Sequence, residues 1–220
     1  RNKLYLEQSK DYAKAVAMDA AKIKYEVSNK LNYVAYIDVK AKTTLKVGDD
    51  ILEMNGEKVE DITIMSGLIQ ELPVGAKIEF KVDRDGKEVG AEAITYEEDG
   101  KKYVGISAIT TFDMKSDIDV QIKTKDSESG PSGGLMMTLM VYNASTNQDL
   151  THGKQVVGTG TIALDGSVGE IGGVKYKVIG AVKEGAEIFL VPEGNYKEAM
   201  EVKKEKGYDL EIVSVKTFTD

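Results

Sequence analysis

The sequence has no cysteine, no tryptophan and a single histidine, His152, and these absences exclude several kinds of site. A chain without cysteine has no disulfide framework and no thiolate nucleophile. With one histidine it also lacks the Cys and His ligands of a structural zinc site. A Ser-His-Asp triad would have to use His152. We therefore expect neither a metal nor a cofactor.

Long apolar runs, basic runs and a nucleotide-binding loop are missing as well. No stretch approaches the roughly 18 apolar residues of a membrane-spanning helix. Acidic residues outnumber basic ones, 37 to 29, and the net charge of −8 argues against a nucleic-acid partner. No segment has the form GxxxxGK[ST], so this chain hydrolyses no ATP by that route.

The composition is that of a globular chain, because 41% of its 220 residues are hydrophobic and 30% are charged. Apolar residues at steps of three or four predict a helix over residues 9–27, with Ser9 as its N-cap. Residues 31–94 have the pattern of short strands, with turns at Asn55-Gly56 and Asp85-Gly86. This region predicts a small strand-rich module.

From about Tyr103 onward, helical and strand patterns alternate, which predicts an α+β or α/β domain. The dipeptide Asp165-Gly166 predicts a hairpin turn. The expected helices of the whole chain beyond residues 9–27 are 62–72, 133–143, 174–183 and 195–206. The expected strands are 33–39, 50–54, 77–82, 118–122, 155–164, 167–171, 187–191 and 210–215.

The most unusual local sequence is Ser129-Gly130-Pro131-Ser132-Gly133-Gly134, directly ahead of an apolar helix. Free N–H groups and the dipole at a helix start stabilise negative charge, which suits the oxyanion formed when a serine attacks a carbonyl. Ser132 is therefore a candidate nucleophile. The alternative is that Ser132 only caps the helix, as most serines in such positions do.

A serine nucleophile needs a base, and a lysine can replace histidine when it is shielded enough to be neutral part of the time. Lys177 follows the segment Ile171-Gly172-Gly173 and lies beside the apolar face of a predicted helix. The alternative is an ordinary surface lysine on an amphipathic helix.

Three ordered motifs resemble the proteolytic domain of Lon-type Ser-Lys proteases. They are Gly130-Pro131-Ser132-Gly133-Gly134, then Gly158-Thr159-Gly160-Thr161-Ile162, then Gly169-Glu170-Ile171-Gly172-Gly173 followed by Lys177. The resemblance implies that Ser132 is the nucleophile and Lys177 the general base. It further implies that Thr159 hydrogen-bonds and orients that lysine. Backbone N–H groups near Ser132 would hold the oxyanion, with Gly133 as a supporting residue.

The middle module resembles bacterial PDZ domains through Leu45-Lys46-Val47-Gly48-Asp49-Asp50-Ile51-Leu52 and the following Asn55-Gly56. The usual glycine-rich loop that binds a peptide carboxylate corresponds in this reading to Leu31-Asn32-Tyr33-Val34, which has no glycine. Together the two resemblances identify the PDZ-containing Lon-type proteases of Gram-positive bacteria, the YlbL-like group.

This resemblance implies an α+β fold in which a PDZ-like domain is inserted into a Lon-like domain of the ribosomal protein S5 domain 2 type. Residues 1–30 and 99–220 would form the Lon-like part, and residues 31–98 the PDZ-like part. The implied function is an ATP-independent serine endopeptidase with protein or peptide substrates, possible oligomerisation, and a membrane anchor holding it on the extracytoplasmic face of the cell membrane. The alternative is a non-catalytic adaptor that keeps the fold and binds partners through its PDZ-like surface.

Overall fold

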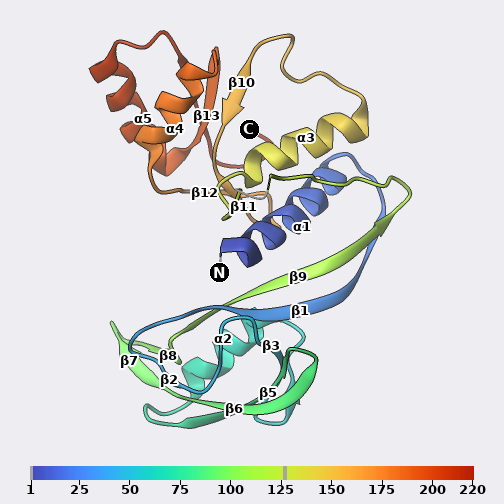
Figure 1. Cartoon of the computed structure of the whole chain (residues 1–220), viewed down its shortest axis with the longest axis vertical. Helices are drawn as coiled ribbons and strands as arrows, with labels where there is room; N and C mark the ends of the chain where they lie inside the picture. Colours follow the sequence, from blue (N-terminus) through green and yellow to red (C-terminus); the bar gives the residue numbers. More distant parts are fainter. Residues whose placement is uncertain (1, 126–127) are drawn as a thin grey trace. The chain divides into compact units, whose positions relative to one another are not determined.

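The computed structural model describes residues 2–125 and 128–220 of the chain (Figure 1). It forms two compact units, which are treated separately below. Unit 1 consists of Arg1–Gln8 and Val27–Asp113, and unit 2 of Ser9–Glu26 and Met114–Asp220. Unit 1 thus interrupts unit 2 in the sequence, and its limits lie outside the 31–98 predicted for the PDZ-like module.

Unit 1 is built on an antiparallel sheet in the order β2-β6-β5-β3-β1-β9, with β4 paired to β3. The strands of this sheet are β1 (Tyr25–Ile37), β2 (Lys42–Thr43), β3 (Asp50–Met54), β4 (Glu57–Lys58), β5 (Lys77–Arg84), β6 (Lys87–Ile94) and β9 (Ile106–Ser116). The helix α2 (Ile62–Glu71) and the hairpin of β7 (Tyr96–Glu98) and β8 (Lys101–Tyr103) complete the unit.

Local sequence explains the turns and the helix of unit 1. Asn55-Gly56 and Asp85-Gly86 have positive φ at both residues, as a tight hairpin turn requires, and both turn predictions are confirmed. Asp61 caps α2 by accepting a hydrogen bond from the Thr63 N–H at 2.8 Å. One apolar cluster, which includes Val34, Ile51, Met65, Ile69, Ile78 and Val82, packs α2 against the sheet.

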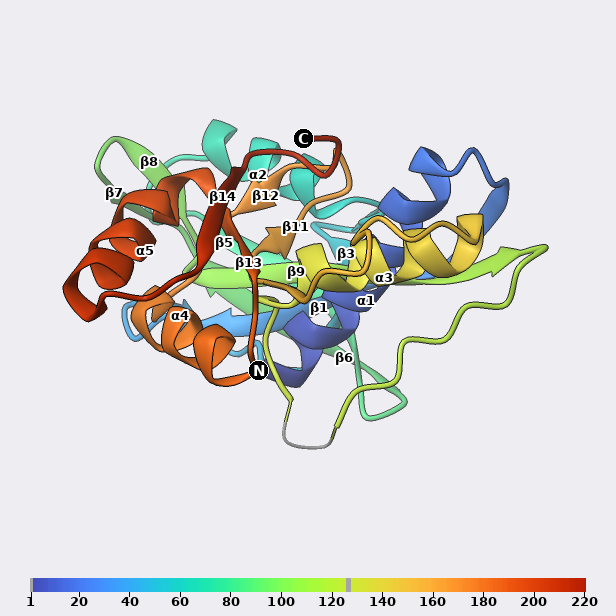
Figure 2. The ribbon, with the colours of Figure 1, turned by 90° about the horizontal axis from the view of Figure 1, so that it is seen from above.

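Unit 2 has a parallel three-stranded sheet in the order β10-β13-β14, and α4 and α5 lie side by side next to it (Figures 1 and 2). Its helices are α1 (Asn2–Ala20, from Ser9 onward), α3 (Gly134–Thr146), α4 (Val174–Lys183) and α5 (Glu193–Lys206). Its strands are β10 (Val156–Gly158), β11 (Thr161–Ile162), β12 (Val168–Gly169), β13 (Ile188–Pro192) and β14 (Glu211–Val215). The β11–β12 hairpin confirms the turn predicted at Asp165-Gly166.

The first helix differs from the prediction at both ends. It begins seven residues earlier than expected, so Ser9 lies in its interior and is not an N-cap. It ends at Ala20 because Lys22 adopts a left-handed conformation with φ 58°. The N–H groups of Lys22 and Ile23 then bond back to Asp19 and Met18, which closes the helix in a Schellman-type turn. Apolar spacing alone could not show this stop.

Two strand predictions were also wrong. Residues 118–122 form no strand, and the strand in this region is β9, which the alternation of apolar residues did not mark. The single strand predicted over 155–164 is split into β10 and β11. The break falls at Thr159-Gly160, where Gly160 has φ 151° and the chain turns toward α3. The α+β class is as predicted.

None of the helices within residues 2–125 and 128–220 combines the length and the apolar character needed to cross a bilayer.

Candidate functional site

Ser132 lies in a short turn that leads into α3. Gly130 has φ 79°, which an L side chain rarely adopts, and so allows the chain to reverse ahead of the helix. The helix cap is Gly133, and it has no side-chain hydrogen bond. Ser132 is therefore not the N-cap that the alternative reading required, and its half-buried hydroxyl points toward another partner.

That partner is Lys177, whose Nζ atom lies 3.4 Å from Ser132 Oγ. The helix α4 begins after Gly173, which has φ 74°, and its buried face carries Val174 and Val178. Lys177 is one position from Val178 and projects from the edge of that face. The structure thus brings together the two side chains that the sequence had singled out 45 positions apart.

The Lys177 side chain is exposed, whereas a neutral lysine base led us to expect a shielded one. The helix buries Val174 and Val178 and leaves Lys177 exposed beside them. Shielding of this amine would have to come from whatever binds over Ser132.

Thr159 lies beneath Ser132 and is almost fully buried. Its hydroxyl donates a hydrogen bond of 3.0 Å to the carbonyl oxygen of Ser132, and the Gly160 N–H donates to the same oxygen at 2.8 Å. The Leu135 N–H in turn donates to the Gly160 carbonyl at 3.1 Å. The loop 158–160 therefore fixes the backbone of Ser132. The hydroxyl of Thr159 bonds Ser132 itself, whereas the resemblance implied a bond to the lysine.

Small residues are required where this loop meets α3. A Cβ atom on Gly134 would lie 2.8 Å from the backbone nitrogen of Ile162, and one on Gly158 would lie 2.7 Å from Met136 Sδ. Real Cβ atoms do not approach other atoms so closely, so any larger residue would push the two segments apart. Close packing therefore explains Gly134 and Gly158.

Ser9 of α1 is a contact that the sequence did not reveal. This serine is buried in the interior of the helix, and its hydroxyl donates a hydrogen bond of 3.4 Å to the Pro131 carbonyl. Its Oγ atom also lies 2.9 Å from where a Gly134 Cβ would be. The available signal is a polar residue on an otherwise apolar helix face, whereas the helix prediction placed Ser9 at the N-cap.

Other chemistry is absent from this neighbourhood. His152 is exposed in a turn, with φ 51°. Within the described residues, no group of three or more His, Cys, Asp or Glu side chains could hold a metal ion.

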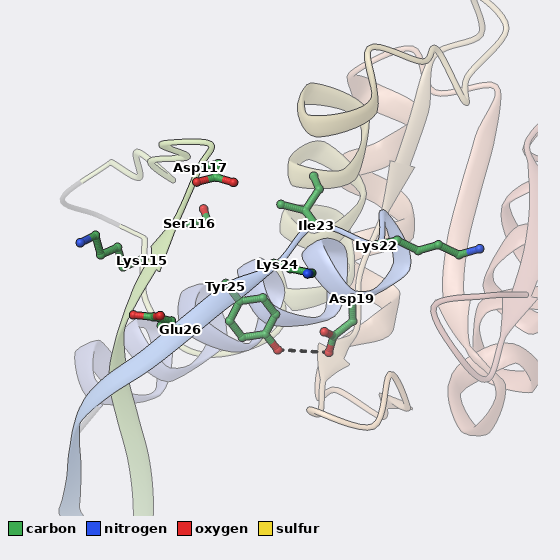
Figure 3. A pocket seen from close by; sticks show the side chains of 9 residues that line it. All are labelled: Asp19, Lys22, Ile23, Lys24, Tyr25, Glu26, Lys115, Ser116 and Asp117. Atoms are coloured by element: carbon green, nitrogen blue, oxygen red, sulfur yellow. Dashed lines mark hydrogen bonds between the residues drawn. The ribbon is translucent and has the colours of Figure 1, made fainter.

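A separate pocket of unit 2, with a volume of about 890 Å³, lies at the end of α1 (Figure 3). The Tyr25 hydroxyl donates to Asp19 at 3.2 Å across it. Three lysines and three carboxylates line it, so it offers no net charge to a ligand, and it includes neither Ser132 nor Lys177. Its lining residues are Asp19, Lys22, Ile23, Lys24, Tyr25, Glu26, Lys115, Ser116 and Asp117. We therefore place the candidate active site at Ser132.

Unit 1 offers a sheet edge. Residues Leu31–Val34 lie inside β1, which pairs with β3 on one side and β9 on the other, so they are not a carboxylate-binding loop. The outer strand is β9, which follows a turn at Gly105 with φ 73°. Ile106 and Ala108 of this strand pack against the apolar cluster that includes α2. An edge strand beside an apolar helix is a place where an extended peptide can be added.

Comparisons with known proteins show which families the two parts of the chain match. The family model described as the Lon protease (S16) C-terminal proteolytic domain matches residues 85–220, and the PDZ domain model matches residues 22–95. A Lon protease of Campylobacter jejuni is 27% identical over 92% of this chain and 25% of its own length. A Lon protease of Mycoplasma mycoides is 32% identical over 61% of this chain and 16% of its own length.

The chain therefore spans about a quarter or less of the curated relatives it matches. Among solved structures, the PDZ domain of an SdrC-like protein from Listeria monocytogenes is 21% identical. The match covers 38% of this chain and 93% of that structure, with a TM-score of 0.33.

Proposed function

The chain belongs to the Lon protease (S16) family, and from this premise we propose that it is a serine endopeptidase whose nucleophile is Ser132 and whose general base is Lys177. The observation that carries the proposal is the separation of 3.4 Å between Lys177 Nζ and Ser132 Oγ. Family membership supports proteolysis in general, and the assignment of these two residues is ours.

In the proposed mechanism, neutral Lys177 takes the proton from the Ser132 hydroxyl as its oxygen attacks the scissile carbonyl. The resulting ammonium then gives this proton to the leaving amine as the C–N bond breaks, which leaves an ester on Ser132. A water molecule, deprotonated by the same amine, attacks the ester carbonyl, and the ammonium returns this proton to Ser132 Oγ as the acyl C–O bond breaks. The lysine therefore returns to its starting state after each turnover.

The oxyanion would be held by backbone N–H groups near the start of α3. The N–H of Gly134 already donates to the Pro131 carbonyl at 3.1 Å, so we assign this role to the N–H of Gly133. The positive end of the α3 dipole adds to this stabilisation.

Substrate itself would shield the exposed Lys177. A peptide lying across Ser132 excludes water from the amine, and loss of water disfavours the charged form of a lysine. Lys177 would therefore act as a base mainly in the enzyme–substrate complex.

We further propose that unit 1 recruits protein substrates by adding an extended segment to the free edge of β9. Main-chain hydrogen bonds would supply affinity, and the apolar cluster beside Ile106 and Ala108 would receive side chains. Binding there raises the effective concentration of the substrate for the catalytic unit.

Energy coupling and location complete the proposal. These 220 residues contain no phosphate-binding loop of the GxxxxGK[ST] form, and we propose that the peptide hydrolysis carried out by this chain needs no ATP. Its resemblance to PDZ-containing Lon-type proteases supports a location on the extracytoplasmic face of the bacterial membrane, held by an anchor. Protease accessibility of the natural protein in intact protoplasts would test that location.

The deciding experiment compares Ser132→Ala with the wild-type chain in the cleavage of an unfolded protein such as casein. We expect the variant to cleave nothing while its circular dichroism spectrum matches that of the wild type. Ser129→Ala, an exposed serine in the same loop, is the matched control and should keep full activity. Unchanged cleavage by Ser132→Ala would refute the assignment, and no cleavage by the wild-type chain would favour the non-catalytic adaptor.

A further inference from the structure

The first turn of α5 holds the segment that leads into α4. Asn195 is 6% exposed, and its side chain forms a closed pair of hydrogen bonds with the backbone of Ile171. The Ile171 N–H donates to Asn195 Oδ1 at 2.8 Å, and Asn195 Nδ2 donates to the Ile171 carbonyl at 3.2 Å. Both the oxygen and the nitrogen of this buried amide are therefore hydrogen-bonded to one residue of a neighbouring segment.

A second contact joins the same two segments. The side chain of Glu170 lies directly over Gly194, at a place where any Cβ atom would collide with it. The Glu170 carboxylate thereby lies at the N-terminal end of α5, where the helix dipole favours negative charge. The first turn of α5 thus fixes two consecutive residues, Glu170 and Ile171.

The segment between Ile171 and Lys177 is short, and it begins with two glycines, which have no side chain to hold it in place. Gly172 and Gly173 follow Ile171 directly, both are exposed, and Gly173 has φ 74°. The helix α4 then starts at Val174, and Lys177 lies within its first turn. The burial of Val174 and Val178 holds α4 against the apolar cluster, and the bonds to Ile171 fix the point from which the two flexible glycines start, so both contribute to the position of the first turn of α4.

We propose that Asn195 is a positioning residue that sets the distance between Lys177 Nζ and Ser132 Oγ through the backbone of Ile171. This inference rests on the proposed function of the Ser132–Lys177 pair. Proton transfer depends steeply on geometry, and a displacement of about 1 Å costs on the order of a hundredfold in rate. Asn195 itself touches neither reacting atom, so its effect would reach the chemistry through the start of α4.

The test compares Asn195→Ala with the wild-type chain in the cleavage of a short, unstructured peptide. We expect kcat to fall by about tenfold or more while KM stays the same, because the base moves and the binding surface does not. The pH dependence of kcat should also differ from that of the wild type, because the geometry of the reacting pair is altered. Lys197→Gln, an exposed change on the same helix, should alter neither quantity.

A second variant keeps the inference testable if Asn195→Ala does not fold. Asn195→Ser adds no charge, and its hydroxyl can replace at most one of the two hydrogen bonds to Ile171. We expect it to show a smaller fall in kcat and a shift in pH dependence in the same direction. Thermal unfolding of each variant establishes that the assay temperature lies below its melting transition.

The inference is overturned if a folded Asn195 variant keeps the wild-type kcat, or if kcat falls without any shift in the pH dependence. A loss of thermal stability alone would show that the hydrogen bonds between Asn195 and Ile171 serve folding only. Ser132→Ala separates this failure from that of the proposed function. If Ser132→Ala abolishes cleavage while the Asn195 variants behave as wild type, only the positioning role is wrong.

Discussion

The buried hydroxyl of Thr159 donates a hydrogen bond of 3.0 Å to the carbonyl oxygen of Ser132. This contact ties the strand break between β10 and β11 to the turn that presents the nucleophile. Thr159→Val keeps the shape of the side chain and removes the donor. We expect it to lower kcat about tenfold and the free energy of unfolding by about 1 kcal/mol.

Thr159→Ser provides the control, because it restores the hydroxyl without the methyl group. Its kcat should lie closer to wild type than that of Thr159→Val. Wild-type activity in Thr159→Val would show that the hydrogen bond does not contribute.

The second prediction concerns Lys177 as the base. A general base must take up a proton and give it back, so the side chain at this position must be able to exist without its proton. Lys177→Arg should abolish activity at every pH, because a guanidinium stays protonated. Lys175→Arg, an exposed change on the same helix, should leave the rate and its pH profile intact. Substantial cleavage by Lys177→Arg would contradict the proposed dyad.

Glycine-to-alanine changes in two helices of unit 2 should have opposite effects. An added methyl group at Gly134 meets the backbone of Ile162 at 2.8 Å, so Gly134→Ala should cost about 2 kcal/mol of stability and also displace Ser132. Gly180 in α4 has open space around it, so Gly180→Ala should stabilise the helix by about 0.5–1 kcal/mol. Urea denaturation of the two variants measures both effects, and a stable, active Gly134→Ala would contradict this packing.

Asp49 and Asp50 are adjacent buried residues of unit 1 whose pKa values move in opposite directions. Burial favours a higher pKa for Asp49, but hydrogen bonds from Arg84 and from a backbone N–H outweigh it and hold the pKa below 3.8. Burial raises the pKa of Asp50 above 3.8, and the nearby charge of Asp83 raises it further despite one backbone hydrogen bond.

These directions give opposite pH dependences of stability. Asp49 stabilises the fold above its unfolded pKa and loses this contribution as the pH falls through its lower folded pKa. Asp49→Asn should therefore cost about 2 kcal/mol at pH 7 and progressively less in acid. Asp50 favours the fold while protonated and loses that contribution as the pH rises through its raised folded pKa.

Asp50→Asn should accordingly stabilise unit 1 at neutral pH and lose this advantage toward about pH 3. Urea denaturation of both variants at the two pH values measures the difference. Two variants that respond to pH in the same direction would contradict the assignment of the shifts.

The last prediction separates recruitment from catalysis. Replacing residues 27–113 by a short linker between Glu26 and Met114 should leave cleavage of short peptides largely intact and weaken cleavage of unfolded proteins. Equal loss for both substrates would show that unit 1 supports the catalytic unit instead of supplying substrate. The variant Ser132→Ala in the same shortened chain provides the background rate.

The sequence predicted best what depends on local pattern. The turns at Asn55-Gly56 and Asp165-Gly166 and the glycine-bounded start of α4 all follow from neighbouring residues. Ser132 and Lys177 were found because their motifs are ordered and specific, and the structure then placed them 3.4 Å apart.

What the sequence missed depends on contacts between distant segments. Ser9 looked like a cap, because nothing in its neighbourhood shows that its hydroxyl bonds Pro131. Asn195 looked like the polar start of a helix, and its partner Ile171 is 24 positions away. The burial of β9 does not alternate along the strand, so no regular alternation of apolar and polar residues marks it in the sequence.

The insertion of unit 1 also bears on the order in which the chain folds. Its two ends are held together within unit 1, since Asn29 Nδ2 donates to Asp113 at 2.6 Å where β1 and β9 run side by side. Once unit 1 has folded, the pairing of β1 with β9 brings Glu26 close to Met114. The two sequence segments of unit 2 are then connected as if by a short loop. Closing an unstructured loop of that length would cost on the order of 4 kcal/mol in chain entropy. Early folding of the insert would remove this cost from the unit that carries Ser132.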